Sequence, residues 1–210
     1  MSIINYQFEP MYGLPASTIL NKPLYKKAVF EKFNLKTAER DRFDADISKM
    51  VLLAYVSPDR VPALSEGKDI KGFYVLQVMM KRKEYDTKNI LLLQKLIPQK
   101  IVFALQYEAQ TQLCIFHTRL QQSEWNDTES TEIPLKGLTL DEVWENIVAT
   151  IGNLDIEAEE TIEEQIINRE EREKLLRQIE QLEKRCRAEK QTRKKFELHQ
   201  QITKLKEELK

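Results

Sequence analysis

Cysteine and histidine are the residue types in this chain best suited to nucleophilic catalysis, and its 210 residues include two of each. Cys114 and His117 stand three positions apart in an apolar run. A thiol within hydrogen-bonding distance of an imidazole makes a nucleophile with its general base. The run is typical of a β-strand, however, and side chains three positions apart on a strand point to opposite faces. We therefore expect both residues to be structural and predict no catalytic residue.

Asp69 and Glu84 flank the apolar run 73–80, where a metal-dependent nuclease would carry carboxylates that hold magnesium. If this run is a strand, the two residues lie at its opposite ends, too far apart to share one ion. Neither His117 nor His199 has further ligand residues at metal-binding spacing. The five glycines are scattered, whereas phosphate-binding loops need them clustered. We predict no metal site and no cofactor, and a cryptic nuclease is the last of three functional alternatives.

Two basic clusters have the composition of a nucleic-acid contact. The first surrounds Tyr25 and Phe30, where charge and stackable rings alternate, and the second lies within 184–195, with seven basic residues and one acidic. The candidate contacts are Lys22, Lys26, Lys27, Arg193, Lys194 and Lys195. The plain alternatives are a docked, solvated arm and the polar tip of a coiled coil. A net charge of −1 creates no long-range field that would attract nucleic acid, so such binding needs a local patch.

Periodicity in the middle of the chain predicts the elements that would position these residues. Strands are expected at 50–56, 73–80, 101–107, 112–119 and 131–135, and helices at 37–49, 89–96 and 140–152. The order predicts an α+β fold over residues 37–155, with a small, mostly antiparallel sheet covered by helices on one side. Residues 1–36 are punctuated by glycine and proline, so we expect them to form an irregular arm.

Residues 156–210 contain no glycine or proline, and 28 of the 55 are charged, so this segment cannot build a globular core of its own. Two apolar runs have the 3–4 spacing of a coiled-coil seam. Their members are Leu175, Ile179, Leu182 and Cys186 in the first run, and Leu198, Ile202, Leu205 and Leu209 in the second. Twelve positions separate Cys186 from Leu198, where an unbroken heptad phase needs 11 or 14. We slightly prefer a helical hairpin with a turn near 189–193 to one continuous helix, which would demand a partner chain.

Several segments together resemble a known bacterial family. They are LPAST with the following Asn21 and Lys22 at 14–22, SEWN at 123–126, KGLTLDEVWEN at 136–146, and the stretch 189–198. Over nearly the whole chain the sequence is similar to the family catalogued as domain of unknown function 4391. The family has no assigned catalytic residues to carry over. The resemblance implies a genetic context beside helicases and DNA methyltransferases, in restriction-like or phage-defence clusters.

We therefore expect a non-enzymatic accessory or adaptor subunit of a bacterial DNA-modification or phage-defence system, acting through protein–protein interaction. The resemblance implies a helicase or DNA methyltransferase as partner, and the coiled-coil seam leaves self-association open. A nucleic-acid-binding protein is the second alternative. The start of the chain shows no secretory signal, no run of about 18 apolar residues is present, and Cys114 and Cys186 have no disulfide or metal spacing. These features predict a cytoplasmic protein with no membrane partner.

Overall fold

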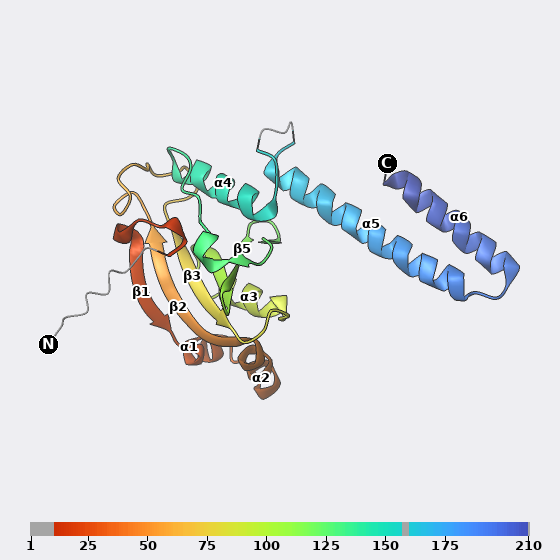
Figure 1. Ribbon diagram of the computed structural model, residues 1–210, viewed down its shortest axis with the longest axis horizontal. Helices are drawn as coiled ribbons and strands as arrows, with labels where there is room; N and C mark the ends of the chain where they lie inside the picture. The colour runs from red at the N-terminus through yellow and green to blue at the C-terminus, as the bar shows by residue number, and fades with distance from the viewer. Residues whose placement is uncertain (1–10, 157–159, 210) are drawn as a thin grey trace. The chain divides into compact units, whose positions relative to one another are not determined.

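The computed structural model describes residues 11–156 and 160–209. It divides the chain into two compact units, residues 1–157 and 158–210, which we call the body and the helical hairpin (Figure 1). The sequence predicts this boundary between residues 155 and 156.

The body is built on one sheet of seven strands in the described residues. The strands are β1 (Ile19–Leu24), β2 (Ile47–Val56), β3 (Phe73–Met80), β4 (Lys100–Tyr107), β5 (Gln110–Phe116), β6 (Leu120–Gln122) and β7 (Asn126–Asp127). Their order is β1-β2-β3-β4-β5-β6, with β7 beside β5. Neighbours are antiparallel except β3 and β4, which run parallel and are connected through α3 (Thr87–Gln94), because a parallel pair requires a crossover. The predicted α+β fold with a mostly antiparallel sheet is confirmed.

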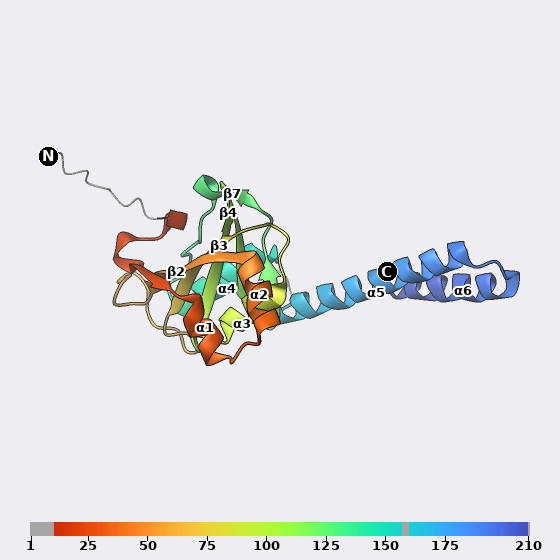
Figure 2. The same ribbon diagram turned by 90° about the horizontal axis from the view of Figure 1, so that it is seen from below.

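Helices cover both faces of this sheet. On the first face, α1 (Lys26–Lys32), α2 (Thr37–Asp46) and α3 pack into the same core cluster as Leu76 and Phe103. On the second face lies α4 (Leu140–Gly152), whose Trp144 ring centroid is 5.6 Å from that of Phe73 (Figure 2). The predicted one-sided cover is wrong, because β3 is apolar in both alternating registers and so exposes two faces that need burial.

Residues 11–36 do not form the irregular arm that the sequence predicts for 1–36. Although residues 1–10 lie outside the described part, residues 19–24 form β1 against β2, and Val29 of α1 is fully buried. Pro23 suggested irregular backbone, but β1 is an edge strand, where proline is tolerated. Residues 19–32 therefore belong to the body and position the first basic cluster on it.

Two other boundaries differ from prediction. The helix expected over 37–49 ends at Asp46, and Ile47 begins β2. The strand expected at 131–135 is absent from the described structure. Ile133 is buried, but its segment is a loop that donates one backbone hydrogen bond to Tyr12 O at 2.9 Å. Short strands β6 and β7 take the place beside β5 instead. The short 3-10 turns are η1 (Met11–Gly13), η2 (Ala16–Thr18) and η3 (Thr128–Ser130).

The second unit is a helical hairpin of α5 (Ile162–Ala188) and α6 (Thr192–Glu208). A capping box begins α5, with Thr161 and Glu164 satisfying each other's backbone N–H. In the turn, the Glu189 carboxylate accepts the N–H groups of Lys190 and Gln191, each at 2.9 Å. The chain thus folds back as the preferred prediction required, not as one continuous helix. None of the helices in the described ranges is both long and apolar enough to cross a bilayer.

Asp46 ties the elements of the first face together. Its side chain is 1% exposed and accepts hydrogen bonds from Arg82 Nε at 2.7 Å, Asn89 Nδ2 at 2.7 Å and the Asp86 backbone N–H at 2.9 Å. Its carbonyl accepts Lys81 N–H at 2.7 Å. A buried carboxylate must be paired to persist, and these four groups fix the end of α2 to the loop after β3 and to the start of α3.

Replacing Asp46 by alanine should destabilise the body by roughly 2–4 kcal/mol, because the Asn89 amide and the Asp86 N–H lose their partner in a buried site. Asp44→Ala is the matched control, since its pair with Lys26 is partly exposed and should contribute less than about 1 kcal/mol. Urea denaturation followed by tryptophan fluorescence measures both, as Trp125 and Trp144 lie in the body. Equal losses in the two variants would contradict this role of Asp46.

Candidate functional site

The predicted seam residues lie along the two helices of the hairpin. Cys186 Sγ contacts Lys195 O at 3.6 Å, and Arg172 donates to Leu209 O at 3.3 Å. In an antiparallel pair, residue numbers rise along one helix as they fall along the other, and both contacts fit one register. That register places Ile179 opposite Ile202, which are 6% and 7% exposed. The two out-of-phase runs are therefore brought together by the turn between them.

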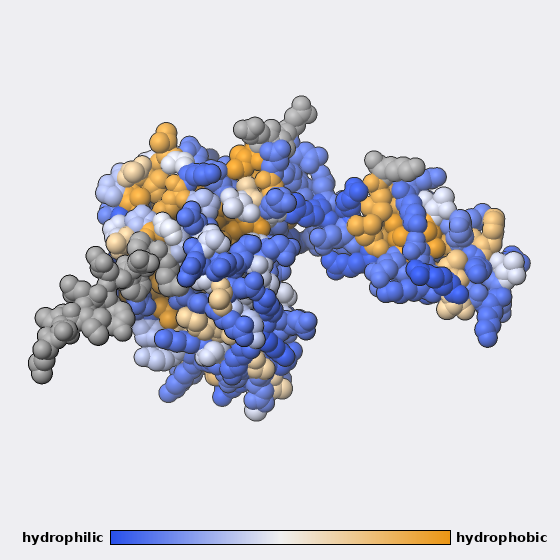
Figure 3. Space-filling view, in the orientation of Figure 1, coloured by the Kyte–Doolittle hydropathy of each residue, from blue (hydrophilic) through white to orange (hydrophobic). Residues whose placement is uncertain are grey.

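The rest of the seam is only partly covered. The half-buried members are Leu175, Leu182, Leu198, Leu205 and Leu209. Beside them, Leu176 is 49% exposed and Phe196 is 63% exposed. Figure 3 shows apolar side chains along the hairpin, between α5 and α6, on the face turned to the viewer. Two helices cover each other on one side only, so the hairpin retains an apolar surface in the described structure.

Charge is distributed unevenly along the same hairpin. Residues 184–195 surround the turn and form what we call the basic tip, with seven basic residues and one acidic. Arg193, Lys194 and Lys195 are all exposed there, and Arg193 Nε lies 3.3 Å from Glu197 Oε1. At the other end, residues 160–173 carry six acidic residues and two arginines. We call this stretch the acidic end.

Ion pairs add to the contacts between α5 and α6. Lys206 Nζ lies 2.7 Å from Glu183 Oε1 across the two helices. This hydrogen bond and the ammonium charge lower the pKa of the Glu183 carboxyl. Two further pairs lie within α5: Lys184 is 2.7 Å from Glu180, and Arg187 is 3.7 Å from Glu183. Such exposed pairs contribute little each, so the apolar seam is the main source of hairpin stability.

The first basic cluster belongs to the body, so the six predicted nucleic-acid contacts fall into two units. Lys26 Nζ is held by Asp44 at 2.5 Å and by Ile47 O at 2.6 Å, with its side chain 22% exposed. Lys26 is therefore a structural link between α1 and the α2–β2 junction. Lys27 is exposed and 3.6 Å from Glu31, and Lys22 is exposed on β1. The cluster offers fewer free cations than its sequence suggests.

Phe30 likewise packs against the core. Its ring packs edge-on against Phe43, with centroids 5.6 Å apart. It docks α1 onto α2, which was the plain alternative to a base-stacking role. Of the two rings in the first basic cluster, Tyr25 is 70% exposed, whereas Phe30 is partly buried.

Asp69 and Glu84 lie in the loops before and after β3. The backbone N–H of Asp69 donates to the carboxylate of Asp141, in the first turn of α4, and Glu84 lines a hollow beyond the other end of β3. Strand β3 has 8 residues, and at about 3.3 Å per residue its two ends are more than 20 Å apart. The two carboxylates are therefore not placed to share one ion. The described residues contain no cluster of three or more histidine, cysteine or acidic side chains placed for metal binding.

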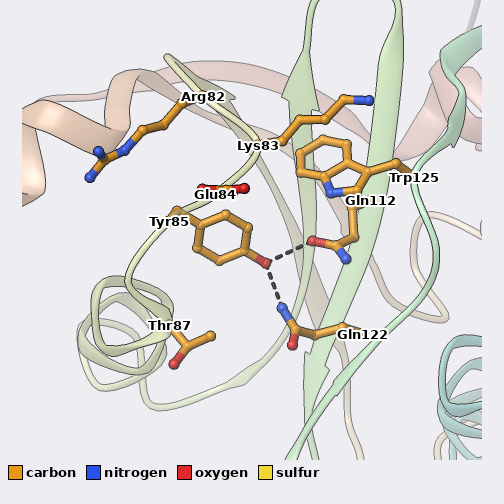
Figure 4. Close-up of a pocket in the computed structure, with 8 residues that line it drawn as sticks. All are labelled: Arg82, Lys83, Glu84, Tyr85, Thr87, Gln112, Gln122 and Trp125. Carbon is orange, nitrogen blue, oxygen red and sulfur yellow. Dashed lines mark hydrogen bonds between the residues drawn. The ribbon is translucent and has the colours of Figure 1, made fainter.

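A hollow of about 530 Å³ lies on the first face of the sheet (Figure 4). Its lining residues are Arg82, Lys83, Glu84, Tyr85, Thr87, Gln112, Gln122 and Trp125. At its centre the Tyr85 hydroxyl donates to Gln112 Oε1 at 2.7 Å and accepts from Gln122 Nε2 at 2.5 Å. Lys83 Nζ lies 5.8 Å from the centre of the Trp125 ring and donates to Gln110. These polar groups satisfy one another.

The Tyr85 phenol in the hollow and the Cys114 thiol, 3.7 Å from its oxygen, both resist deprotonation. Burial, with the nearby Cys114 thiol, raises the pKa of the Tyr85 phenol above its usual range. Burial also raises the pKa of Cys114 to about 12, so both groups stay protonated at neutral pH and neither is a base or a nucleophile. Trp125 is half-buried at the edge of the core, as the sequence predicts. The sequence did not reveal the hollow, because its residues come from three distant segments.

A search of curated proteins and a search of solved structures both give no match to the chain. A family model does match it, over residues 12–209, which covers the body and the helical hairpin alike. The resemblance seen in the LPAST, SEWN and KGLTLDEVWEN segments is thereby confirmed. The chain belongs to the family described as Domain of unknown function (DUF4391).

Proposed function

We propose that this protein is a non-enzymatic adaptor subunit whose helical hairpin is an assembly arm. The observation that carries the proposal is the half-exposed seam, in which Leu175, Leu182 and Leu205 are each only partly covered. The hollow on the body adds support, because the Tyr85 phenol in it and the Cys114 thiol next to that phenol both stay protonated. In this role the body provides a docking surface, and the hairpin holds the complex together.

The energetics of a two-helix unit favour such a role. A small unit with a single layer of contact buries too little apolar surface to be stable alone, and oligomerisation is a common remedy. Covering the remaining area of each half-buried leucine would contribute on the order of 1 kcal/mol. The described seam has five such leucines. Further helices packed on the hairpin would therefore stabilise it as well as join the chains.

Family resemblance suggests the setting. It implies neighbours that are helicases and DNA methyltransferases, so we take one of these as the large partner and a bacterial DNA-modification or phage-defence complex as the assembly. Because such partners act on DNA in the cell interior, this proposal places the protein in the cytoplasm. The even balance of charge, −1 over the whole chain, suits an adaptor that binds protein.

The basic tip supports a second candidate function, which is nucleic-acid binding. Folding of the hairpin gathers seven basic residues around one turn, and Phe196 beside them is 63% exposed. Cations next to an exposed ring match the chemistry of single-stranded nucleic-acid contacts. The tip is a better candidate than the first cluster, where Lys26 and Phe30 are already engaged.

A chain that ends at Asp155 should lose the subunits that co-purify with the full chain from its host, because the assembly arm is gone. The body should stay folded, as it is a separate compact unit. Leu182→Asp, on the seam, should give the same loss, whereas Leu138→Asp, at a body leucine 75% exposed, should not. Affinity purification with mass spectrometry measures the loss, and circular dichroism checks folding. Undiminished recovery of the same subunits without the hairpin would contradict the adaptor function.

If the tip binds nucleic acid, the affinity should fall steeply with ionic strength, because phosphate contacts release counterions. Changing Arg193, Lys194 and Lys195 together to alanine should then reduce the salt slope by roughly one per lost phosphate contact. A triple alanine variant of Lys49, Lys68 and Lys88, exposed on the body, is the control. Fluorescence anisotropy with single-stranded DNA and RNA makes the measurement. No binding of either at low salt rules out this second function.

A further inference from the structure

The uneven charge of the hairpin identifies a partner for its open seam. We propose that the hairpin pairs with the hairpin of a second copy of this chain in antiparallel orientation, so that the basic tip of each copy lies against the acidic end of the other. This pairing rests on the proposed function, because the second copy is the chain that packs on the half-exposed seam. The product is a four-helix bundle that carries two bodies.

Charge complementarity carries the choice of partner. The basic tip has seven basic residues and one acidic, a formal charge of 7 − 1 = +6, and the acidic end has two basic and six acidic, 2 − 6 = −4. Glu207 and Glu208, at the end of α6 away from the turn, add two more carboxylates near the acidic end. The same chain therefore carries both a basic region and an acidic region that can attract each other across a dimer interface. In a dimer with a twofold axis, the contact between a basic tip and an acidic end occurs twice.

The same charges select the orientation. Parallel hairpins would place two basic tips side by side, and like charges in contact disfavour a complex. Antiparallel hairpins bring opposite charges together at both ends. The paired part of the hairpin runs from the Arg172–Leu209 contact to the turn, and Ile179 and Ile202 lie near its middle. A twofold axis there superimposes the apolar seam of one copy on that of the other.

Helix lengths leave room for this arrangement. Helix α5 has 27 residues and α6 has 17, and the pairing ends at Arg172. Residues 162–171 of α5 therefore extend beyond α6, by about 15 Å at 1.5 Å per residue. Ile167, in this extension, is 47% exposed. The turn of the second copy fits beside the extension, next to Glu170 and Glu171.

Complementary charge reversal in the full chain tests the proposal. The tip-reversed variant carries Arg193→Glu, Lys194→Glu and Lys195→Glu, and the end-reversed variant carries Glu170→Lys, Glu171→Lys and Glu173→Lys. Light scattering with size exclusion and sedimentation equilibrium should show a dimer for the unaltered chain. Each variant alone should dissociate with a constant raised about tenfold or more. The three changes lower the formal charge of the tip from +6 to 0, which removes the attraction at both contacts, and raise that of the acidic end from −4 to +2, which makes both contacts repulsive.

Mixing the two variants should restore a dimer. One contact of the mixed dimer then joins an unaltered tip of charge +6 to an unaltered acidic end of charge −4, and in the other contact the new glutamates face the new lysines. A body variant with Lys49→Glu, Lys68→Glu and Lys88→Glu changes the net charge as much as the tip-reversed variant and should dimerise like the unaltered chain. A monomeric unaltered chain, or dimers insensitive to either reversal, overturns the proposal. Failure of the mixture to recover, with both variants helical by circular dichroism, overturns the antiparallel pairing.

These results are separable from a failure of the proposed function. If the chain is monomeric but the hairpin is still needed to recover host subunits, the seam serves another protein and only this inference fails. If the chain dimerises as described but deleting the hairpin leaves those subunits in place, the adaptor function fails and the pairing stands. If the tip-reversed variant loses only DNA or RNA binding and stays dimeric, the tip contacts nucleic acid and the charge pairing is wrong.

Discussion

A two-helix hairpin covers each of its helices on one side only, and this geometric constraint governs the second unit of the protein. Ile179 and Ile202 are buried against the opposite helix, whereas leucines such as Leu175 and Leu205 are only half-covered. Weak exposed ion pairs do not compensate for apolar surface left in water. Any further helix that packs on the seam would therefore stabilise the hairpin, and the proposed partner is the one that matches its charge pattern.

In the body, by contrast, a layer of helices covers each face of the central sheet and buries a core between sheet and helices. Asp46 joins α2, α3 and the loop after β3 through buried hydrogen bonds, and helices cover both sheet faces. The hollow beside Tyr85 is held by the same loop, and its hydroxyl and amide groups are already paired. Burial keeps Tyr85 and Cys114 protonated, so neither of these two groups can exchange protons or attack a substrate at neutral pH.

Sequence alone predicted the parts of the fold that depend on local periodicity. The 12-residue interval between Cys186 and Leu198 broke the heptad phase, and the turn lies within that interval. Strand β1 was missed because Pro23 is acceptable only at a sheet edge, a position that tertiary pairing decides. The second helical face was missed although the apolar residues of β3 occupy both registers, a pattern that indicates a strand buried on two faces. The role of Asp46 and the hollow could not be predicted from the sequence, because the residues that form them are distant in the chain and share no motif.

Amide hydrogen exchange of the full chain at low and high protein concentration tests the central claim, that the hairpin uses its seam to pair with another chain. Exchange reports local opening in each element separately. The account predicts that amides of α5 and α6 become more protected as concentration rises, while those of β2 to β5 do not change. Equal protection of α5 and α6 at both concentrations, in a chain shown to be monomeric throughout, would contradict pairing between copies.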